Sequence, residues 1–466
     1  MTITEASAVR GRDALLAPLV AALREAPADE AELWVHRRRA AITRYSHSSI
    51  HQNALSDETH VHARAQVGGA VGGASGTAID SGGALSTDSL RALLQDAATI
   101  ARLQRANPDW PGFAEKASYE PPHAFDAATA DADAQEQARA IGRICAALPT
   151  TQRAAGTHAI DLTEDAVANT RGVAAYAPAT VAYLRALVQG DAGGAGYADD
   201  LAASVAGLDP EGIARRASEK CALDRDRAQL APGDYEAVFE EDAVAEILRI
   251  VSITGCSGQA VLEGRSFMAE HVGEQVTGTA FTLEDDARHP LQLGIPFDVE
   301  GTPKERVTLV DRGVVRGPVY DRASARAAGA HSTGHAADPV RYASGGHAGN
   351  LVMAGGEATR EQLIASVKRG ILITRFHYTN TPDPRRATMT GTTRDGTFLI
   401  EDGRIARALA NLRYTMSALE LFAGIELLGR QRLVRDWWST NGMGSIVCLA
   451  PAMKVSRATI TGSSPV

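Results

Sequence analysis

The residues of this sequence that most resemble a chemical centre are two histidines four positions apart, His331 and His335, in the run HSTGH. Histidines at positions i and i+4 of a helix share one face, and zinc peptidases present two ligands in this way. The serine, threonine and glycine between them are poor helix formers, so the pattern predicts a loop. No glutamate follows His331 to act as a general base. We therefore favour structural or substrate-contacting histidines and keep a metal site of His331, His335 and His347 as the alternative.

Three other patterns point less strongly to chemistry. The glycine-rich stretch 68–76 has neither the Lys-Ser/Thr of a phosphate loop nor GxGxxG spacing, so it is typical of a flexible hairpin. Cys256 lies in Gly-Cys-Ser-Gly, but Gln259 stands where a nucleophile elbow needs glycine, and the thiol becomes a candidate nucleophile only beside a histidine base. His60 and His62 follow strand alternation, and no nearby Asp-His completes a metal site.

The elements that must hold these residues begin with a predicted antiparallel sheet. Residues 60–67 alternate apolar and polar side chains, as in a half-buried strand. Shorter strand-like runs occupy residues 31–36 and 41–45, and the cluster Arg37-Arg38-Arg39 between them is expected at a solvated strand edge. Further strand-like segments lie at residues 158–162 and 181–188.

Three helices are predicted to pack on this sheet. Their signals are capping residues, apolar side chains at helical spacing and prolines that end the pattern. The first begins at Ser86 or Thr87 and ends before Pro108, the second carries Ile141, Ile144, Cys145 and Leu148, and the third has Asp209 as its cap and Pro210 at its first position.

The run Leu230-Ala-Pro-Gly-Asp234 breaks the periodicity, and we place a domain boundary there, with residues 1–229 in the first domain and 230–466 in the second. The second domain opens with a helix that has Val244, Ile247, Leu248 and Val251 on one face. Extended runs follow at Arg306–Val310, Gly313–Val319, Ile371–Tyr378, Thr397–Ile400 and Ser445–Leu449. The predicted fold class is α+β, with an N-terminal sheet and packed helices followed by a mainly β domain.

Composition excludes several classes of protein. The 466 residues are too many for one ordinary core. A formal net charge of -9 argues against a partner such as nucleic acid or an anionic membrane surface. No apolar run approaches a membrane span, and the N-terminus has no apolar signal region before its first charges, so we expect a cytoplasmic protein. The four cysteines are scattered without a CxxC pair, which predicts isolated reduced thiols.

Widely separated motifs resemble one known family. These are LAPGDYEAVFEEDAVAEIL, QAVLEGRSF, DRGVVRGPVYDRASARAAG, STGHA, GTTRDGTFLIEDGRIARALANLRY and APAMKV, with DWPGFAE, GYADD and LDPEGIARRASEKCALDR in the first half. In this order they are similar to the TldD/TldE (PmbA) family of zinc metallopeptidases, over nearly the whole chain. The resemblance implies a heterodimer in which TldD holds zinc through HExxxH and a distant cysteine, and its glutamate activates water. The partner subunit, TldE, has a similar fold, lacks the motif and closes the cavity in which peptides are cut.

The sequence resembles the TldE type. The family's HExxxH window falls on about residues 249–254, Arg-Ile-Val-Ser-Ile-Thr, and no His-Glu dipeptide occurs anywhere in the chain. Cys448 lies near the place of the third ligand, but its surroundings, GSIVCLAPAMKV, match the partner subunit's ending. The resemblance therefore implies that this chain lacks zinc and the catalytic glutamate, and that a HExxxH-bearing partner supplies both.

The expected function is that of a TldE-like subunit that helps to form the cavity for peptides or peptide-like natural-product precursors. Motif position suggests tunnel or interface residues, namely Arg265, Ser332, Thr333, Gly334 and His335. Extended substrates would bind by strand addition, and the segment Asn380–Gly391 could alter specificity. General peptide turnover and specialised biosynthesis both stay open. The rival hypotheses are a stand-alone peptide- or client-binding homodimer and an independent metal hydrolase that uses His331, His335 and His347.

Overall fold

The computed structural model describes residues 8–338, 345–435 and 446–463, and one six-stranded antiparallel sheet dominates its first half. The strands lie in the order β3-β2-β1-β4-β5-β6. Four of them are 17 to 19 residues long, far above the usual ~5–6 residues of a strand. Their bounds are β1 Glu30–Ser46, β2 Ser49–Val67, β3 Ala70–Gly76, β4 Gln152–Asn169, β5 Ala174–Gly190 and β6 Ala195–Ala202.

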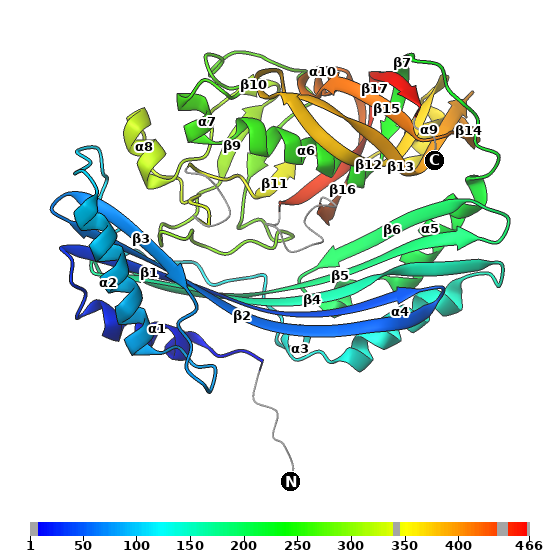
Figure 1. Cartoon of the computed structure of the whole chain (residues 1–466). Coiled ribbons are helices and arrows are strands. Elements are labelled where there is room, and N and C mark those ends of the chain that lie inside the picture. The colour runs from blue at the N-terminus through cyan, green and yellow to red at the C-terminus, as the bar shows by residue number, and fades with distance from the viewer. Residues whose placement is uncertain (1–7, 339–344, 436–445, 464–466) are drawn as a thin grey trace, which may run out of the picture.

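Both faces of this N-terminal sheet are covered. On β1, Leu33 and Val35 point to one face and belong to a buried cluster with the helices α1 and α2, whereas Trp34 points to the other and shares a cluster with Phe297 of the second half. Figure 1 shows the sheet curving beneath the C-terminal half, with the helices on its opposite side. These helices are α1 Arg12–Leu23, α2 Thr87–Leu103, α3 Ala127–Ala130, α4 Ala134–Ala147 and α5 Pro210–Leu223.

The C-terminal half is built on a mixed eleven-stranded sheet. Strand β17 pairs with β15 and β7, and the pairs β15–β13, β13–β12 and β12–β7 close these five strands into a ring. The bounds are β7 Gly233–Phe239, β8 Leu283–Asp285, β9 Val307–Asp311, β10 Val314–Val315, β11 Asn350–Met353, β12 Arg369–Asp383, β13 Thr388–Glu401, β14 Arg404–Ala408, β15 Leu412–Ser417, β16 Ile425–Arg435 and β17 Val447–Ser463.

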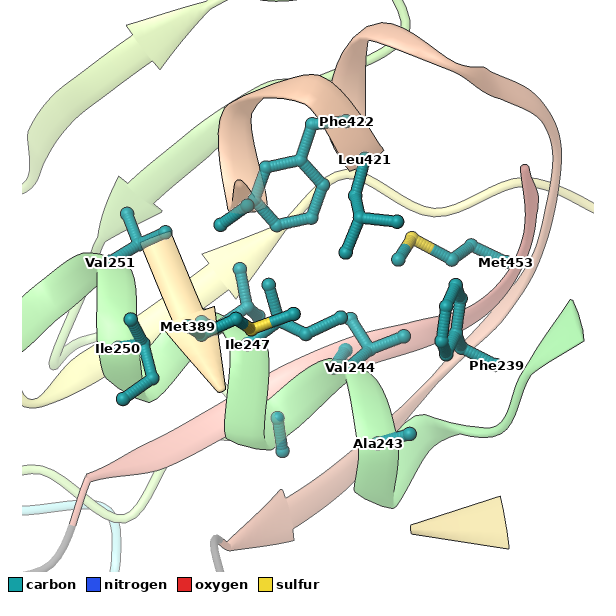
Figure 2. Packing of buried hydrophobic residues seen from close by; sticks show 14 of the residues in the cluster. Phe239, Ala243, Val244, Ile247, Ile250, Val251, Met389, Leu421, Phe422 and Met453 are labelled. Atoms are coloured by element: carbon teal, nitrogen blue, oxygen red, sulfur yellow. The ribbon is translucent and has the colours of Figure 1, made fainter. Parts of the chain in front are cut away.

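Helix α6 is the centre of the largest core cluster. It spans Glu241–Gly255, and Val244, Ile247 and Val251 of its apolar face are fully buried. Figure 2 shows these side chains among Phe239, Met389, Leu421, Phe422 and Met453, which come from the end of β7 and from β13, α10 and β17. The remaining helices of the described C-terminal residues are α7 Gly258–Leu262, α8 Arg322–Ala328, α9 Arg360–Ala365 and α10 Ala418–Ala423.

The predicted fold class is confirmed: an N-terminal antiparallel sheet with packed helices precedes a sheet-rich C-terminal domain. The caps Ser86 and Asp209 begin α2 and α5 as expected. The limit between residues 229 and 230 falls between α5 and β7 and stays a prediction. Of the predicted extended run Ser445–Leu449, Ser445 lies outside the described residues, and Val447 to Leu449 form the start of β17. None of the helices in the described ranges is long and apolar enough to cross a membrane.

The expectation of a solvated edge at Arg37-Arg38-Arg39 is wrong. The two flanking runs form one continuous strand, β1, which lies inside the sheet between β2 and β4. Arg37 is 4% exposed and donates to Glu164 at 2.5 Å and to Asp57 at 2.9 Å. Because both carboxylates come from neighbouring strands, the sequence around residue 37 held no sign that this arginine is buried and paired.

Candidate functional site

The α6 window, residues 249–254, is occupied by core and helix-stabilising side chains. Ile250 and Val251 are 1% and 0% exposed and pack in the main core. The Ser252 hydroxyl donates to the carbonyl oxygen of Ala348 at 2.5 Å, and the Thr254 hydroxyl donates back to the carbonyl of Ile250 at 2.6 Å. The two hydroxyls of this window are therefore bonded to backbone carbonyls, and the window contains no His, Cys, Asp or Glu that could bind a metal.

His335 is a buried structural residue in the loop that carries HSTGH. It is 1% exposed, its Nε2 lies 2.9 Å from the Asp285 carboxylate, and its Nδ1 lies 2.8 Å from the carbonyl oxygen of Thr333. The Thr333 hydroxyl also lies 2.9 Å from Nδ1, so each ring nitrogen has a hydrogen-bond neighbour. Asp285 also accepts from the backbone N–H of Asn350. The pair therefore ties the loop to strands β8 and β11.

The electrostatics of Asp285 fit this role. Burial by itself would raise the pKa of the Asp285 carboxyl, but the adjacent His335, Lys304 and the Asn350 N–H hold its pKa below the usual value. Nearby, burial lowers the pKa of His347 to about 4, so this imidazole is neutral at pH 7. The backbone N–H of His347 donates to the carbonyl of His335 at 2.8 Å.

The three histidines of the metal alternative do not form one centre. The side chain of His331 is 76% exposed and lies 3.1 Å from Glu305, on the surface, whereas His335 pairs with Asp285 in the interior. Across residues 8–338, 345–435 and 446–463, no group of three or more His, Cys, Asp or Glu side chains is placed to hold a metal ion. The donor set therefore does not fit zinc, and no chemical step is assigned to a metal in this chain.

The rest of HSTGH is held from within the chain. The Thr333 hydroxyl donates to the carbonyl of Tyr320 at 3.1 Å and accepts from the Tyr320 N–H at 2.8 Å. Gly334 has φ +71°, and a Cβ there would lie 2.1 Å from the carbonyl oxygen of Pro303. Only glycine fits this close approach. Ser332 is half-buried beside the same Tyr320 carbonyl.

Arg265, the remaining predicted tunnel or interface residue, is separate from that loop. Its side chain is 57% exposed and pairs with Glu263, and its backbone N–H donates to the carbonyl of Ala260. No hydrogen bond or ion pair among the described residues joins it to residues 331–335. Of the predicted set, Arg265 and Ser332 are thus reachable from solvent, while Thr333, Gly334 and His335 are buried within this chain.

The alternative nucleophile, Cys256, is excluded by its surroundings. The residue is fully buried, and burial raises the pKa of its thiol well above the usual range. Its Sγ donates to the carbonyl of Val251 at 3.5 Å. A thiol that stays protonated in an apolar core is a packing residue, because the thiolate is the reactive form.

A pocket of about 380 Å³ lies between the N-terminal sheet and the C-terminal domain. Its floor is the face of β1, β4, β5 and β6 that is turned away from α4 and α5, and its other wall comes from Arg375 of β12 and Asp395 of β13. The apolar part of the lining consists of Ile42, Ala155, Ala159 and Leu187. The cationic side chains are Arg44, Arg185 and Arg375, and the exposed His51 also lines the pocket.

Two tyrosines of the pocket are fixed by hydrogen bonds. The hydroxyls of Tyr183 and Tyr197 both donate to Asp199, at 3.1 Å and 2.9 Å, and Arg432 of the C-terminal domain donates to the same carboxylate at 3.0 Å. Burial and the Asp199 charge raise the pKa of both tyrosines, so they stay neutral. The guanidinium of Arg375 stacks 4.6 Å from the Tyr197 ring centroid. Hydrogen bonds and ring stacking within this chain therefore position the wall without a ligand.

Sequence reasoning missed this pocket because its residues are far apart in the chain and meet only through strand register. Arg44 pairs with Thr157 on β4, and Thr157 pairs with Arg185 on β5. The available signal was local: Arg44 follows Ile42, and Arg185 lies between Tyr183 and Leu187, so each places a charge on a face otherwise made of small or apolar residues.

With the geometry in place, comparisons with known proteins can be assessed. Residues 232–462 match the PmbA/TldA metallopeptidase C-terminal domain. The chain is 26% identical over 223 residues to the metalloprotease TldD homolog of Haemophilus influenzae, which covers 45% of this chain and 44% of that protein. It is 25% identical over 206 residues to the metalloprotease PmbA of Escherichia coli O157:H7, covering 43% and 41%. The match therefore spans less than half of each curated relative.

A solved structure extends the likeness in fold to almost the whole molecule. TldE from Thermococcus kodakarensis superposes with a TM-score of 0.85 and covers 96% of this chain and 100% of that chain, at 20% sequence identity. At this identity the likeness shows the fold. Residues 232–462 therefore carry the PmbA/TldD family domain, and nearly the whole chain shares the fold of TldE.

Proposed function

We propose that this chain is a TldE-like subunit of a heterodimeric zinc metallopeptidase, and that it shapes the peptide cavity without supplying the zinc or the catalytic glutamate. The observation that carries the proposal is the α6 window. Its inward positions hold the core residues Ile250 and Val251, and its hydroxyls bond to backbone carbonyls. A homologous HExxxH-bearing partner would supply the zinc and its activated water.

The surface near that window supports a role in association. Ile253 at the end of α6 is 41% exposed, Leu262 at the end of α7 is 44% exposed, and Val272 is 57% exposed. Exposed apolar side chains are favourable contacts for a partner subunit. Arg265 lies in the same stretch of chain and is available to contact the partner or substrate. We place the contact with the HExxxH subunit on this side of the C-terminal domain.

An open strand edge supports the binding of extended chains. Strand β3 covers only residues 61–67 of β2, so residues 49–60 pair with β1 alone among the described strands. Unpaired N–H and C=O groups can accept an added strand, from a peptide or from a partner subunit. Side-chain pockets would then set specificity. The tip around residues 380–391, which includes the 3-10 turn Pro384–Arg386, is our candidate for tuning it.

The substrates follow from the proposed cavity: extended peptides or peptide-like natural-product precursors, processed in the cytoplasm, either in general turnover or in a dedicated biosynthetic step. The test is co-expression with a HExxxH-bearing homologue from the same genome. We expect a stable 1:1 complex that hydrolyses unfolded peptides and carries zinc in the partner. Leu262→Asp should weaken the complex, while Leu103→Asp, at a residue that is 82% exposed on α2, should not.

Two rival functions are distinguished by the isolated chain. An independent metal hydrolase requires about one zinc per chain and peptide cleavage without a partner, both lost in His335→Ala. A stand-alone binding protein requires peptide binding with no complex formation in the co-expression test. The stand-alone binding function stays a candidate because this chain by itself forms a pocket between its N-terminal sheet and its C-terminal domain. Zinc and activity in the isolated chain would overturn the proposed division of labour.

A further inference from the structure

The pocket between the N-terminal sheet and the C-terminal domain has an excess of positive charge at its floor. Arg44, Thr157 and Arg185 lie in register on the neighbouring strands β1, β4 and β5. Neighbouring strands are about 4.8 Å apart, so the two arginine backbones are separated by roughly 10 Å across the threonine. All three residues line the same pocket, with Thr157 on the strand between those that carry the two arginines.

Among the described residues, neither Arg44 nor Arg185 is paired with a carboxylate. Arg185 is half-buried, and its guanidinium makes no hydrogen bond or ion pair within the described part of the chain. Arg44 makes one long bond, 3.4 Å to the amide oxygen of Gln52. The third arginine differs, because Asp395 neutralises Arg375 through its Nε at 2.7 Å. Arg44 is exposed, and the more buried cations of this sheet, Arg37 and Arg64, are each paired with two carboxylates.

A half-buried, unpaired guanidinium is unfavourable unless something compensates it. The planar donor fork of arginine matches the two oxygens of a carboxylate. The neighbouring walls are apolar or aromatic, from Ile42, Leu187 and Tyr197. Such a lining suits an anion carried on an apolar body better than a fully hydrated inorganic ion. A volume of about 380 Å³ lies at the lower end of the ~300–1,000 Å³ common for small-ligand pockets.

We propose that this pocket binds the C-terminal carboxylate of a short peptide, with Arg185 and Arg44 as the carboxylate-binding residues and the wall of Ile42, Leu187 and Tyr197 holding the last side chain. The choice of a peptide as the carrier of the carboxylate rests on the proposed function. The anion site itself does not, because every lining residue belongs to this chain. The pocket would therefore hold the end of a substrate or product independently of the partner's zinc.

The test uses the isolated full-length chain and calorimetric titration, with no hydrolysis readout. The probes are N-acetyl-leucyl-leucine as the free acid, the same compound as the C-terminal amide, and inorganic phosphate. We expect the acid to bind, and the amide to bind at least about tenfold more weakly, because a charge-assisted bidentate contact is lost. Binding of the acid should weaken with rising salt, as expected for a partly exposed ion pair.

Variants assign the effect to the named side chains. Arg185→Met keeps much of the aliphatic bulk and should weaken binding of the acid by about tenfold or more. Arg185→Lys keeps the charge but loses the bidentate donor geometry, so its affinity for the acid should lie between those of the wild type and Arg185→Met. Arg44→Gln should also weaken the binding of the acid. Arg105→Met is the matched control, because Arg105 is exposed and outside the pocket. Circular dichroism confirms that each variant folds.

Three outcomes would overturn the proposal. Equal binding of acid and amide would remove the carboxylate from recognition, and unchanged binding in Arg185→Met and Arg44→Gln would remove the arginines. Phosphate binding as tightly as the acid would reassign the pocket to inorganic or phosphorylated ligands. A chain that binds the acid but forms no heterodimer would instead contradict the proposed function and leave the carboxylate site standing.

Discussion

At the scale of single residues, His335 shows how a histidine with metal-like spacing becomes a structural residue. Its partner, Asp285, is 50 positions earlier in the chain, so the pair cannot be recognised from the local run HSTGH. The two side chains are both fully shielded from solvent. In the interior, such a pair is stable only when both members are present, because removing one leaves an uncompensated charge.

The first prediction concerns this pair. His335→Ala should lower the free energy of unfolding by about 3 kcal/mol, because Asp285 would be left buried and unpaired. His331→Ala is the matched control and should change it by less than about 0.5 kcal/mol, since an exposed ion pair with Glu305 contributes little. Urea unfolding followed by circular dichroism measures both. Equal effects of the two substitutions would contradict the structural role of His335.

The second prediction concerns Gly334 within the same loop. Gly334→Ala should cost roughly 3 kcal/mol or more, because the new Cβ would meet the Pro303 carbonyl in addition to backbone strain. Gly329 has a similar φ of +65° at the end of α8 but has nothing within 4 Å of an added Cβ. Gly329→Ala should therefore show the strain alone, about 1 kcal/mol. The difference between the two unfolding free energies isolates the steric contact.

At the scale of elements, capping and apolar periodicity predicted helices well. The Ser86 hydroxyl accepts from the Ser89 N–H, and the Asp209 carboxylate accepts from the Gly212 N–H, as the sequence indicated. The strands were found only in pieces. Residues 158–162 and 181–188 are fragments of β4 and β5, because a sheet covered on both faces does not alternate clearly between apolar and polar side chains.

Helix α1, Arg12–Leu23, was not predicted. It contains Pro18 and has no side-chain hydrogen bond at its N-cap, so it lacks the capping signal, although its leucines recur at helical spacing. Its stability comes from tertiary packing instead, with Leu15 and Leu19 fully buried against the N-terminal sheet. In physical terms, propensity identified the capped helices, and contacts that only the folded chain makes determined this one.

Helix α6 gives the third prediction, because its window positions differ in burial. Ile250→Glu should destabilise the protein by roughly 4 kcal/mol, since it places a carboxylate in the main core without a partner. Ile253→Glu, three residues later on the same helix, should change stability by no more than about 0.5 kcal/mol because Ile253 is 41% exposed. Thermal unfolding of the two variants measures the contrast.

That contrast also bears on the proposed function. The second position of the HExxxH window falls on Ile250, so a catalytic glutamate could not be introduced there without disrupting the core shown in Figure 2. If Ile250→Glu were as stable as the wild type, the side chain at this position would face solvent or a cavity, and the argument that α6 is a purely structural helix would fail.

At the scale of the whole molecule, charged side chains join the N-terminal sheet to the C-terminal domain. Arg64 donates to Glu32 of its own sheet at 3.0 Å and to Glu300 of the C-terminal domain at 2.9 Å. Arg322 donates from the C-terminal side to the backbone carbonyls of residues 111–113. The bonds from Arg64 to Glu300 and from Arg322 to residues 111–113 connect positions more than 200 residues apart, and no local pattern in the sequence could have predicted them.

The fourth prediction is a pH dependence that originates at this junction. Burial, reinforced by the Glu300 charge and opposed by Arg64, raises the pKa of Glu32 from 4.5 to about 7. Between pH 4.5 and about 7, the Glu32 carboxyl is therefore protonated in the folded state and ionised in the unfolded state. Stability from this group is fully present below pH 4.5 and is lost as the pH rises through 7. The expected loss between pH 5 and 8 is about 2 kcal/mol.

Glu32→Gln removes the titrating group, so its unfolding free energy should fall less steeply between pH 5 and 8 than that of the wild type. Glu25→Gln is the matched control, because the Glu25 side chain is 62% exposed and stays in water when the protein unfolds. Unfolding in urea at half-unit pH steps gives the slopes directly. Parallel slopes for the wild type and Glu32→Gln would mean that the carboxylate is charged in the folded protein, held by Arg64 despite its burial. The junction would then be an ordinary ion pair whose strength does not change across neutral pH.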